Sequence, residues 1–312
     1  MDWMKDLLKL LIFPGLGFQF CCALLAEWVD RRLIARFQGR VGPPLIQPLA
    51  DLIKLFAKED LLPGGVSHKT MTALPVISLT ACLTAGIYIP VAGFSGHQFE
   101  GDLIVVLFLL SLPSLLYFLA GWSSIGVYSI LGGNRALLQF FSYEVPFLMA
   151  LAGPAILSGS WSISQIVDQQ VSTVWGVFVQ PVGFMLALIG LIGKLKRDPL
   201  DIPKAKSETL AGPLTEFSGR KLAIWHLANR IQTVVGTFLL VNTFLGGGVR
   251  QNPLATVLLF TFLVLLILAS MSLASAMYAR LRIDQLASLG WKGMIPLSLL
   301  QIAFVIWMGK GM

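Results

Sequence analysis

The sequence predicts an all-α, polytopic membrane protein with about eight transmembrane helices and one short amphipathic interfacial helix. Of its 312 residues, 56% are hydrophobic and only 12% are charged, whereas a soluble domain carries about 25% charged residues. The hydrophobic residues form long continuous stretches, without the 3.6-residue spacing of a soluble amphipathic helix. Each of these stretches is long enough to cross a hydrocarbon core of about 30 Å, and the last one has little length to spare.

The expected spans follow one another along the whole chain. The first has about 20 apolar residues and no small-residue cleavage site after it, so we interpret it as a retained helix and not as a signal peptide. No linker, repeat or low-complexity segment divides the chain, which predicts a single transmembrane domain over residues 1–312. The eight spans are Leu7–Val29, Met71–Ala92, Leu103–Trp122, Gln139–Leu157, Val174–Gly193, Leu222–Leu245, Pro253–Tyr278 and Trp291–Met308.

The positive charges predict how the helices are oriented. The loops after the first, third, fifth and seventh spans, about residues 30–70, 122–138, 194–221 and 279–292, hold 18 of the 23 Lys and Arg residues. By the positive-inside rule these loops are cytoplasmic and both termini lie on the outer side of the membrane. A basic balance of this kind indicates contact with anionic lipid or a partner, not with nucleic acid.

The first long loop contains a short helix. In Pro48–Lys58, apolar residues recur at helical spacing and charged residues lie on the other side; they are Leu49, Leu52, Ile53 and Phe56 against Asp51, Lys54 and Lys58. This pattern predicts an amphipathic helix at the membrane interface. The spacing is compatible both with a helix packed on the bundle and with one that walls a cavity entrance.

Glu144 is the principal candidate for ion translocation. It lies in the segment Phe141–Phe147 near the cytoplasmic end of the fourth span, where a carboxylate is costly unless it is paired, wetted or protonated. Pro146 frees a backbone carbonyl that can hold water beside it. These features are typical of a proton relay, and the alternative is an acidic helix cap at the interface.

The second long loop and the sixth span also carry charges. The charge pattern of residues 194–221, taken alone, favours a solvated loop. The prolines and glycines between these charges indicate fixed turns instead, and hence a docking surface or proton funnel. In the sixth span, His226 and Asn229 precede Arg230. A buried arginine requires a counter-charge, for which Glu144 or Glu216 is a candidate, unless the side chain snorkels to the interface.

The cysteines and histidines predict no metal site. Cys21, Cys22 and Cys82 lie within expected helices without CxxC spacing, and the three histidines are scattered. Iron–sulfur and zinc sites need clustered ligands. We therefore expect this chain to bind no metal.

Short motifs occur in order along almost the whole chain. In the first loop they are Asp30-Arg31-Arg32, Gln38, Arg40, Gly42-Pro43, Gln47-Pro48, Asp51, Lys54-Leu55 and Lys58-Glu59; around the fourth span, Gly121-Trp122, Ser124, Tyr128, Leu131-Gly132, Arg135, Gln139 and Ser142-Tyr143-Glu144; in the central loop, Pro199-Leu200-Asp201, Ser207-Glu208, Gly212 and Glu216–Gly219; and in the last loop, Arg280, Arg282, Asp284-Gln285-Leu286, Trp291-Lys292 and Pro296. Together they resemble the membrane subunit that joins the peripheral and membrane arms of respiratory complex I and of energy-converting hydrogenases.

The resemblance implies a coupling subunit of a redox-driven ion pump, with no catalytic residue and no redox cofactor of its own. It implies cytoplasmic hydrogenase-like and iron–sulfur partner subunits, antiporter-like membrane subunits, and an energy-transducing, prokaryotic plasma membrane with its lipid. The chain would wall a cavity below a partner's iron–sulfur cluster. Glu144, Asp201, Glu208 and Glu216 would form the proton path; Arg36, Gln38, Arg40, Asp51, Lys54, Arg135, Arg280, Arg282 and Asp284 would form the cavity and docking face.

The resemblance leaves two branches open. The short stretch Val41–Pro48 and the residues of Gly212–Gly219 resemble the hydrogenase form of the family (formate hydrogenlyase-type). In that form a nickel–iron site in a partner subunit catalyses the reaction and no quinone enters the cavity. In the complex I branch the cavity admits quinone, with Arg36, Arg40 and Asp51 along its path. An independent transporter would need inverted repeats or paired broken helices, and the chain shows neither. The pumped ion is H⁺ or Na⁺.

Four carboxylates that are usual in the resembled family are missing. Lys194, Lys204 and Lys206 stand in their place in and before the central loop, and Asn229 in the sixth span. Because an exposed lysine stays charged near neutral pH and repels cations, the proton route either uses the remaining acids or is interrupted. Alternatively, the inverted charge marks an anionic partner surface or a differently tuned coupling step. We expect a cavity near Arg40, Asp51 and Asp201 that does not turn over quinone.

Overall fold

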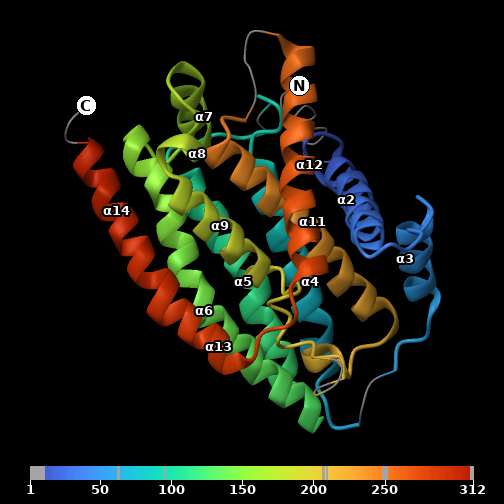
Figure 1. The fold of residues 1–312 in the computed structure, drawn as a ribbon. Coiled ribbons are helices and arrows are strands. Elements are labelled where there is room, and N and C mark those ends of the chain that lie inside the picture. Colours follow the sequence, from blue (N-terminus) through green and yellow to red (C-terminus); the bar gives the residue numbers. More distant parts are fainter. Residues whose placement is uncertain are drawn as a thin grey trace.

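The protein is a bundle of helices in the computed structural model (Figure 1). The structure describes residues 11–61, 64–94, 96–205, 208, 210–247 and 252–309. Over those ranges it contains no strand, only an isolated bridge between Val91 and Phe94. The predicted all-α fold class is therefore confirmed.

The helices of the described residues follow the hydrophobic stretches of the sequence. Their bounds are α2 (Leu16–Phe37), α3 (Gln47–Ala57), α4 (His68–Tyr88), α5 (Asp102–Trp122), α6 (Val127–Ser158), α7 (Ile163–Ser172), α8 (Gly176–Val179), α9 (Pro181–Lys194), the short η1 (Gly212–Leu214), α11 (Gly219–Phe244), α12 (Pro253–Met277), α13 (Ile283–Ser288), η2 (Leu289–Met294) and α14 (Ile295–Gly309).

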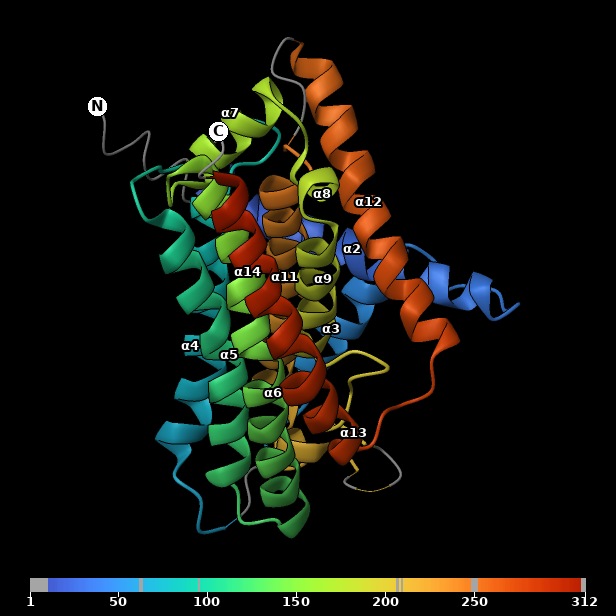
Figure 2. The same cartoon turned by 60° about the vertical axis from the view of Figure 1, so that its left-hand side comes forward.

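Helix α11 lies at the centre of the bundle. Every residue from Arg230 to Phe244 is buried, because α2, α3, α4 and α12 pack against it and α9 contacts it as well. Figures 1 and 2 show it enclosed in both views. A helix that is surrounded by protein can carry polar residues as long as its neighbours supply partners, and this position explains why α11 contains Asn229, Arg230 and Gln232.

Five of the described helices are long and apolar enough to cross a membrane. They are α4, α5, α6, α12 and the continuous segment Ile283–Met308. The other three expected spans correspond to α2, which carries Glu27, Asp30, Arg31 and Arg32, to α9, which has only 14 residues, and to α11. The structure therefore supports a polytopic membrane protein, and the count of eight spans stays a prediction.

The fourth span begins earlier than its composition predicts. Helix α6 starts at Val127, not at Gln139, so only residues 123–126 of the expected loop 122–138 lie outside helices. The glycines of this stretch permit close packing: a Cβ on Gly132 would lie 2.7 Å from the Cα of Gly212. In the same way, α13 and η2 occupy most of the expected loop 279–292.

Helix α3 confirms the predicted amphipathic helix of the first loop. It packs against α2 and α11 and buries Leu52, whereas Leu49, Ile53 and Phe56 remain exposed. The helix is thus fixed to the bundle on one side and offers an apolar side to lipid or to a partner.

Candidate functional site

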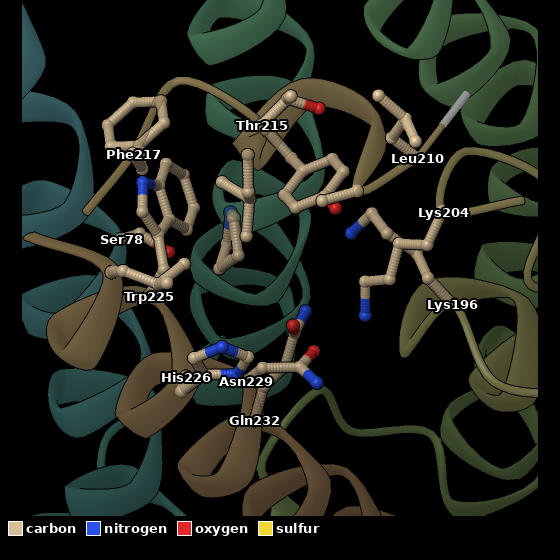
Figure 3. A pocket seen from close by; sticks show the side chains of 15 residues that line it. Ser78, Lys196, Lys204, Leu210, Thr215, Phe217, Trp225, His226, Asn229 and Gln232 are labelled. Carbon is tan, nitrogen blue, oxygen red and sulfur yellow. The ribbon is translucent and has the colours of Figure 1, made fainter. Parts of the chain in front are cut away.

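A cavity of about 410 Å³ lies between α4, α5 and α11 and the described residues of the central loop, 195–205 and 210–218 (Figure 3). This volume falls within the range of about 300–1,000 Å³ that is typical of small-molecule sites. One part of the wall is apolar and aromatic, with Pro113, Leu214, Phe217, Leu222 and Trp225; another is polar, with Ser78, Lys196, Lys204, His226, Asn229 and Gln232. In Figure 3 the amine ends of Lys196 and Lys204 point into the open space from the same side.

A smaller cavity of about 140 Å³ adjoins the first, since His226 and Asn229 line both. Its charged lining residues are Glu27, Asp30, Arg31, Arg197 and Arg230. The two cavities together place polar space on both sides of α11, from the central loop to α2.

A cluster of four charges joins α2, α3 and α11 beside the smaller cavity. Arg230 and Arg31 both form ion pairs with Glu27, and Arg31 also pairs with Asp51 at 2.7 Å. The Arg230 guanidinium donates to the backbone carbonyl of Pro48 at 3.1 Å. The prediction that Glu144 or Glu216 neutralises Arg230 is therefore wrong, because the packing of α2 against α11 brings Glu27 to it instead.

A second ion pair ties the central loop to the bundle. Arg197 donates to Asp30 of α2 at 2.9 Å, and the hydroxyl of Ser272 on α12 donates to the same carboxylate at 2.6 Å. The loop is therefore held at a fixed position, which favours the prediction of fixed turns over that of a solvated loop.

Glu144 forms a buried ion pair with Lys194. The Lys194 ammonium donates to Glu144 Oε1 at 2.8 Å between α6 and α9; Lys194 is fully buried and Glu144 is only 6% exposed. Because α6 begins at Val127, Glu144 lies well inside this helix and is not its cap. A lysine in place of a usual carboxylate thus gives Glu144 a direct counter-charge, and Lys194 is not the exposed cation that its sequence position suggested.

Polar contacts connect this ion pair with the larger cavity. The Lys196 ammonium lies 3.4 Å from the backbone carbonyl of Lys194 and 3.5 Å from the hydroxyl of Ser114. The Tyr143 hydroxyl, next to Glu144 in sequence, donates to the same Ser114 oxygen at 2.9 Å. We call Lys196, Ser114, Tyr143, Lys194 and Glu144 the polar chain.

Two groups in the central loop have pKa values near neutrality. Burial, together with the charges of Lys204 and Lys194, lowers the pKa of Lys196 to about 7. Burial raises the pKa of Asp201 to about 6, although Lys204 and Arg280 oppose that shift. Both side chains therefore exchange protons close to physiological pH.

The other predicted proton-path carboxylates do not meet at one place. Asp201 pairs with Arg280 at 3.2 Å, and Glu208 forms an ion pair with Arg135. Glu216 is partly buried against the backbone of Gly126. Glu144, Asp201, Glu208 and Glu216 thus occupy four separate sites, and their joint role in proton transfer stays a prediction.

The predicted cavity and docking residues are mostly on the surface. Arg36, Gln38, Arg40, Lys54, Arg280, Arg282 and Asp284 are exposed or partly exposed, and Arg135 and Asp51 are partly buried in ion pairs. Arg31 holds the pKa of Asp51 below its usual range by donating a hydrogen bond to it. Arg40, Asp51 and Asp201, near which we expected the cavity, line neither of the two cavities described above.

Sequence reasoning did not identify Glu27, Tyr117 or Lys196. Glu27 lies inside the first expected span, and its charge within an apolar stretch was the signal that would have found it. Lys196 has no such signal, since one lysine in a basic loop resembles any other until the fold buries it. Lys206 lies outside the described residues.

Within the described ranges, no group of three His, Cys, Asp or Glu side chains is placed to hold a metal ion.

A further cavity of about 400 Å³ has an almost entirely apolar wall, which α2, α11 and α12 form together with the α4–α5 connection. Phe18, Phe238 and Phe260 are among its lining residues.

Comparison with known proteins shows the family of the chain. The family model described as NADH dehydrogenase matches residues 10–306. The H subunit of NADH-quinone oxidoreductase from Dehalococcoides mccartyi is 36% identical over 95% of this chain and 85% of that relative. The H subunit of F(420)H(2) dehydrogenase from Methanosarcina mazei is 33% identical over 98% of this chain and 94% of that relative.

The fold is also similar to that of a solved respiratory complex. A chain of the membrane-bound sulfane sulfur reductase, an archaeal respiratory membrane complex, superposes with a TM-score of 0.87 at 27% sequence identity, covering 97% of this chain and 99% of that one. Family model, relatives and fold agree over nearly the full length. The chain therefore belongs to the NADH dehydrogenase family and is a membrane subunit of the complex I family.

Proposed function

We propose that this chain is the coupling and anchor subunit of a redox-driven ion pump, crossing the membrane eight times with both termini on the outer side. It holds a cytoplasmic redox module of hydrogenase-like and iron–sulfur subunits and transmits its energy to antiporter-like membrane neighbours. The redox centres, iron–sulfur clusters and a nickel–iron site, belong to those partners. The observation that carries the proposal is the buried Glu144–Lys194 ion pair and its contact with the larger cavity through the polar chain.

The polar chain is suited to coupling because it links Lys196, which titrates near neutral pH, to the buried ion pair of Glu144 and Lys194. A redox change at the cavity alters the local charge and hence the proton occupancy of Lys196, whose pKa is about 7. Lys196 contacts the backbone of Lys194, so a change in its charge acts directly on the Glu144–Lys194 pair, where little water screens it. Lysines in this chain therefore take part in the proton route instead of interrupting it.

We place the chain in the hydrogenase-like branch, in which no quinone is reduced. Two observations support this placement: the stretch Val41–Pro48 is short, and Arg36, Arg40 and Asp51, which would line a quinone path, line neither the larger nor the smaller cavity. The names of the relatives favour a second candidate, the quinone-site subunit of an NADH:quinone oxidoreductase.

Electron transfer to quinone separates the two candidates. The purified complex, supplied with its electron donor, is expected to show no reduction of a short-chain quinone that a quinone-site inhibitor blocks. Mass spectrometry of the same preparation identifies the redox partner, and a nickel–iron subunit is expected. Inhibitor-sensitive quinone reduction would replace the first candidate with the second.

The first and central loops are expected to form the docking face for the redox module. Replacing both Arg36 and Arg40 with Glu should release that module as the salt concentration is raised, because ion pairs between exposed groups weaken with screening. The measurement is co-purification of the module over a salt series. Lys292→Glu, an exposed charge reversal outside these two loops, is the control. Equal retention of the module by both variants would exclude docking through the two arginines.

A further inference from the structure

The larger cavity holds two lysines that form no salt bridge with a carboxylate of the described residues. Lys196 is only 6% exposed and Lys204 is partly buried, and neither forms an ion pair within those ranges. Instead, both ammonium groups face the ring of Tyr117, at 4.6 and 6.0 Å from its centroid. Asp201, the nearby acid, interacts with the charges of both lysines, but its carboxylate pairs with Arg280 and does not line the cavity. Buried cations normally have a counter-charge, and one carboxylate that is shared with Arg280 does not offset two lysines, so this part of the wall favours a negatively charged ligand.

Three further donors line the same cavity without a hydrogen-bond acceptor in the described part of the chain. They are the hydroxyls of Ser78 and Tyr117 and the indole N–H of Trp225, and each belongs to a side chain that is at most 4% exposed. Buried donors are nearly always paired in folded proteins. A cavity whose lining combines unpaired donors with two buried lysines indicates a ligand that accepts hydrogen bonds and carries negative charge.

The opposite part of the wall defines the rest of the ligand. Phe217 and Trp225 lie across the open space from the two amines in Figure 3, and Leu214 and Leu222 add aliphatic surface. Water molecules can accept hydrogen bonds from the donors in a polar cavity. Water does not neutralise two cations, however, and it gains no favourable apolar contact with the aromatic and aliphatic wall.

We propose that the larger cavity is a binding site for a small organic anion, a carboxylate-type oxyanion held between Lys196 and Lys204 whose apolar or aromatic body packs on Leu214, Phe217 and Trp225. The site shares Lys196 with the polar chain, but its test does not depend on the proposed coupling function, because binding is measured without electron transfer or an ion gradient.

The proposal predicts a pH dependence with a definite sign. The titratable and charged groups around Lys196 are Lys194 on α9, Lys204 and Asp201 in the loop, Cys82 on α4, Tyr117 on α5, Tyr143 on α6 and, across the cavity, His226 on α11. Below pH 7 Lys196 is charged and ready to bind the anion. Above about pH 7 it loses its proton, so affinity falls by up to about tenfold per pH unit.

Ligand-observed ¹⁹F NMR of the purified complex tests this site with 4-fluorobenzoate as the probe. A benzoate-type carboxylate titrates near pH 4 and stays charged from pH 6 to 8, so its own ionisation does not change. We expect binding to wild type that weakens from pH 7 to 8. Lys196→Gln and Lys204→Gln should each weaken it about tenfold or more, since each removes a charge-assisted hydrogen bond. Lys196→Gln should also reduce the pH dependence, and the remainder belongs to Lys204, whose pKa burial lowers as well.

Matched controls keep the test decisive if a variant is unstable. Lys196→Arg keeps the charge and should retain binding, and Lys69→Gln, an exposed lysine on α4, should bind as wild type does. The neutral 4-fluorobenzamide and the short trifluoroacetate ion should bind wild type at least about tenfold more weakly than 4-fluorobenzoate. Equal binding of the benzamide would contradict the anion site, and equal binding of trifluoroacetate would contradict its apolar half.

Discussion

Lys194→Met is expected to destabilise the protein by about 3–5 kcal/mol, because it leaves Glu144 as an unpaired charge in the bundle interior. The present contact is a 2.8 Å ion pair with both side chains almost inaccessible to solvent. Glu144 Oε2 has no hydrogen-bond partner among the described residues, so the carboxylate depends on Lys194 alone. Unfolding of the purified complex in a detergent titration measures the effect.

A double-mutant cycle separates the ion pair from simple loss of packing. Glu144→Gln combined with Lys194→Met removes both charges, and a buried pair replaced by uncharged groups of similar volume is often tolerated. The double variant should therefore be more stable than Lys194→Met. Lys69→Met, an exposed lysine on α4, is the control for lysine replacement as such. If Lys194→Met were as stable as that control, the pair would not hold α6 and α9 together.

The helices of this protein were predictable because their signal is local. Runs of apolar residues identify α4, α5, α6 and α12 whatever they pack against. The boundary of α6 was misjudged because the span was expected to begin at Gln139, whereas the helix extends back to Val127. In that extension Gly132 and Gly133 permit η1 and α5 to approach closely, and this packing depends on the tertiary structure.

The partners of the buried charges were not predictable from spacing. Glu144 was identified, since an acid in an apolar span is conspicuous, but its partner Lys194 lies 50 residues away and was interpreted as an exposed cation. Arg230 was likewise recognised as needing an acid, and Glu27 meets it only because α2 lies against α11. The sequence shows which charged groups cost free energy when they are buried. Only the fold shows which neighbouring group of opposite charge compensates for that free energy.

The larger cavity illustrates the same limit. Lys196 and Lys204 appeared as members of a basic loop, whereas in the fold they face Tyr117 in a cavity that Leu214 of η1 also lines. Burial, not residue type, moves the pKa of Lys196 toward neutrality. A lysine can then serve where an acid would otherwise carry a proton.

Glu144→Gln is expected to uncouple the complex while leaving electron transfer intact. The substitution keeps the shape of the side chain and removes its ability to titrate, and it touches none of the residues proposed to dock the redox module. We expect the ion gradient to fall by roughly tenfold or more, as expected when a positioned proton-transfer group is lost. Glu144→Asp, which restores a titratable group, should recover part of it, and the double variant with Lys194→Met excludes instability as the cause.

The most direct test of the coupling role is the redox-driven ion gradient of the complex in proteoliposomes, recorded together with its electron-transfer rate. H⁺ is followed with a pH-sensitive dye and Na⁺ by isotope uptake, so that either ion is detected. The account predicts that Glu144→Gln loses the gradient at an unchanged electron-transfer rate. A gradient of wild-type size in that variant would contradict the account.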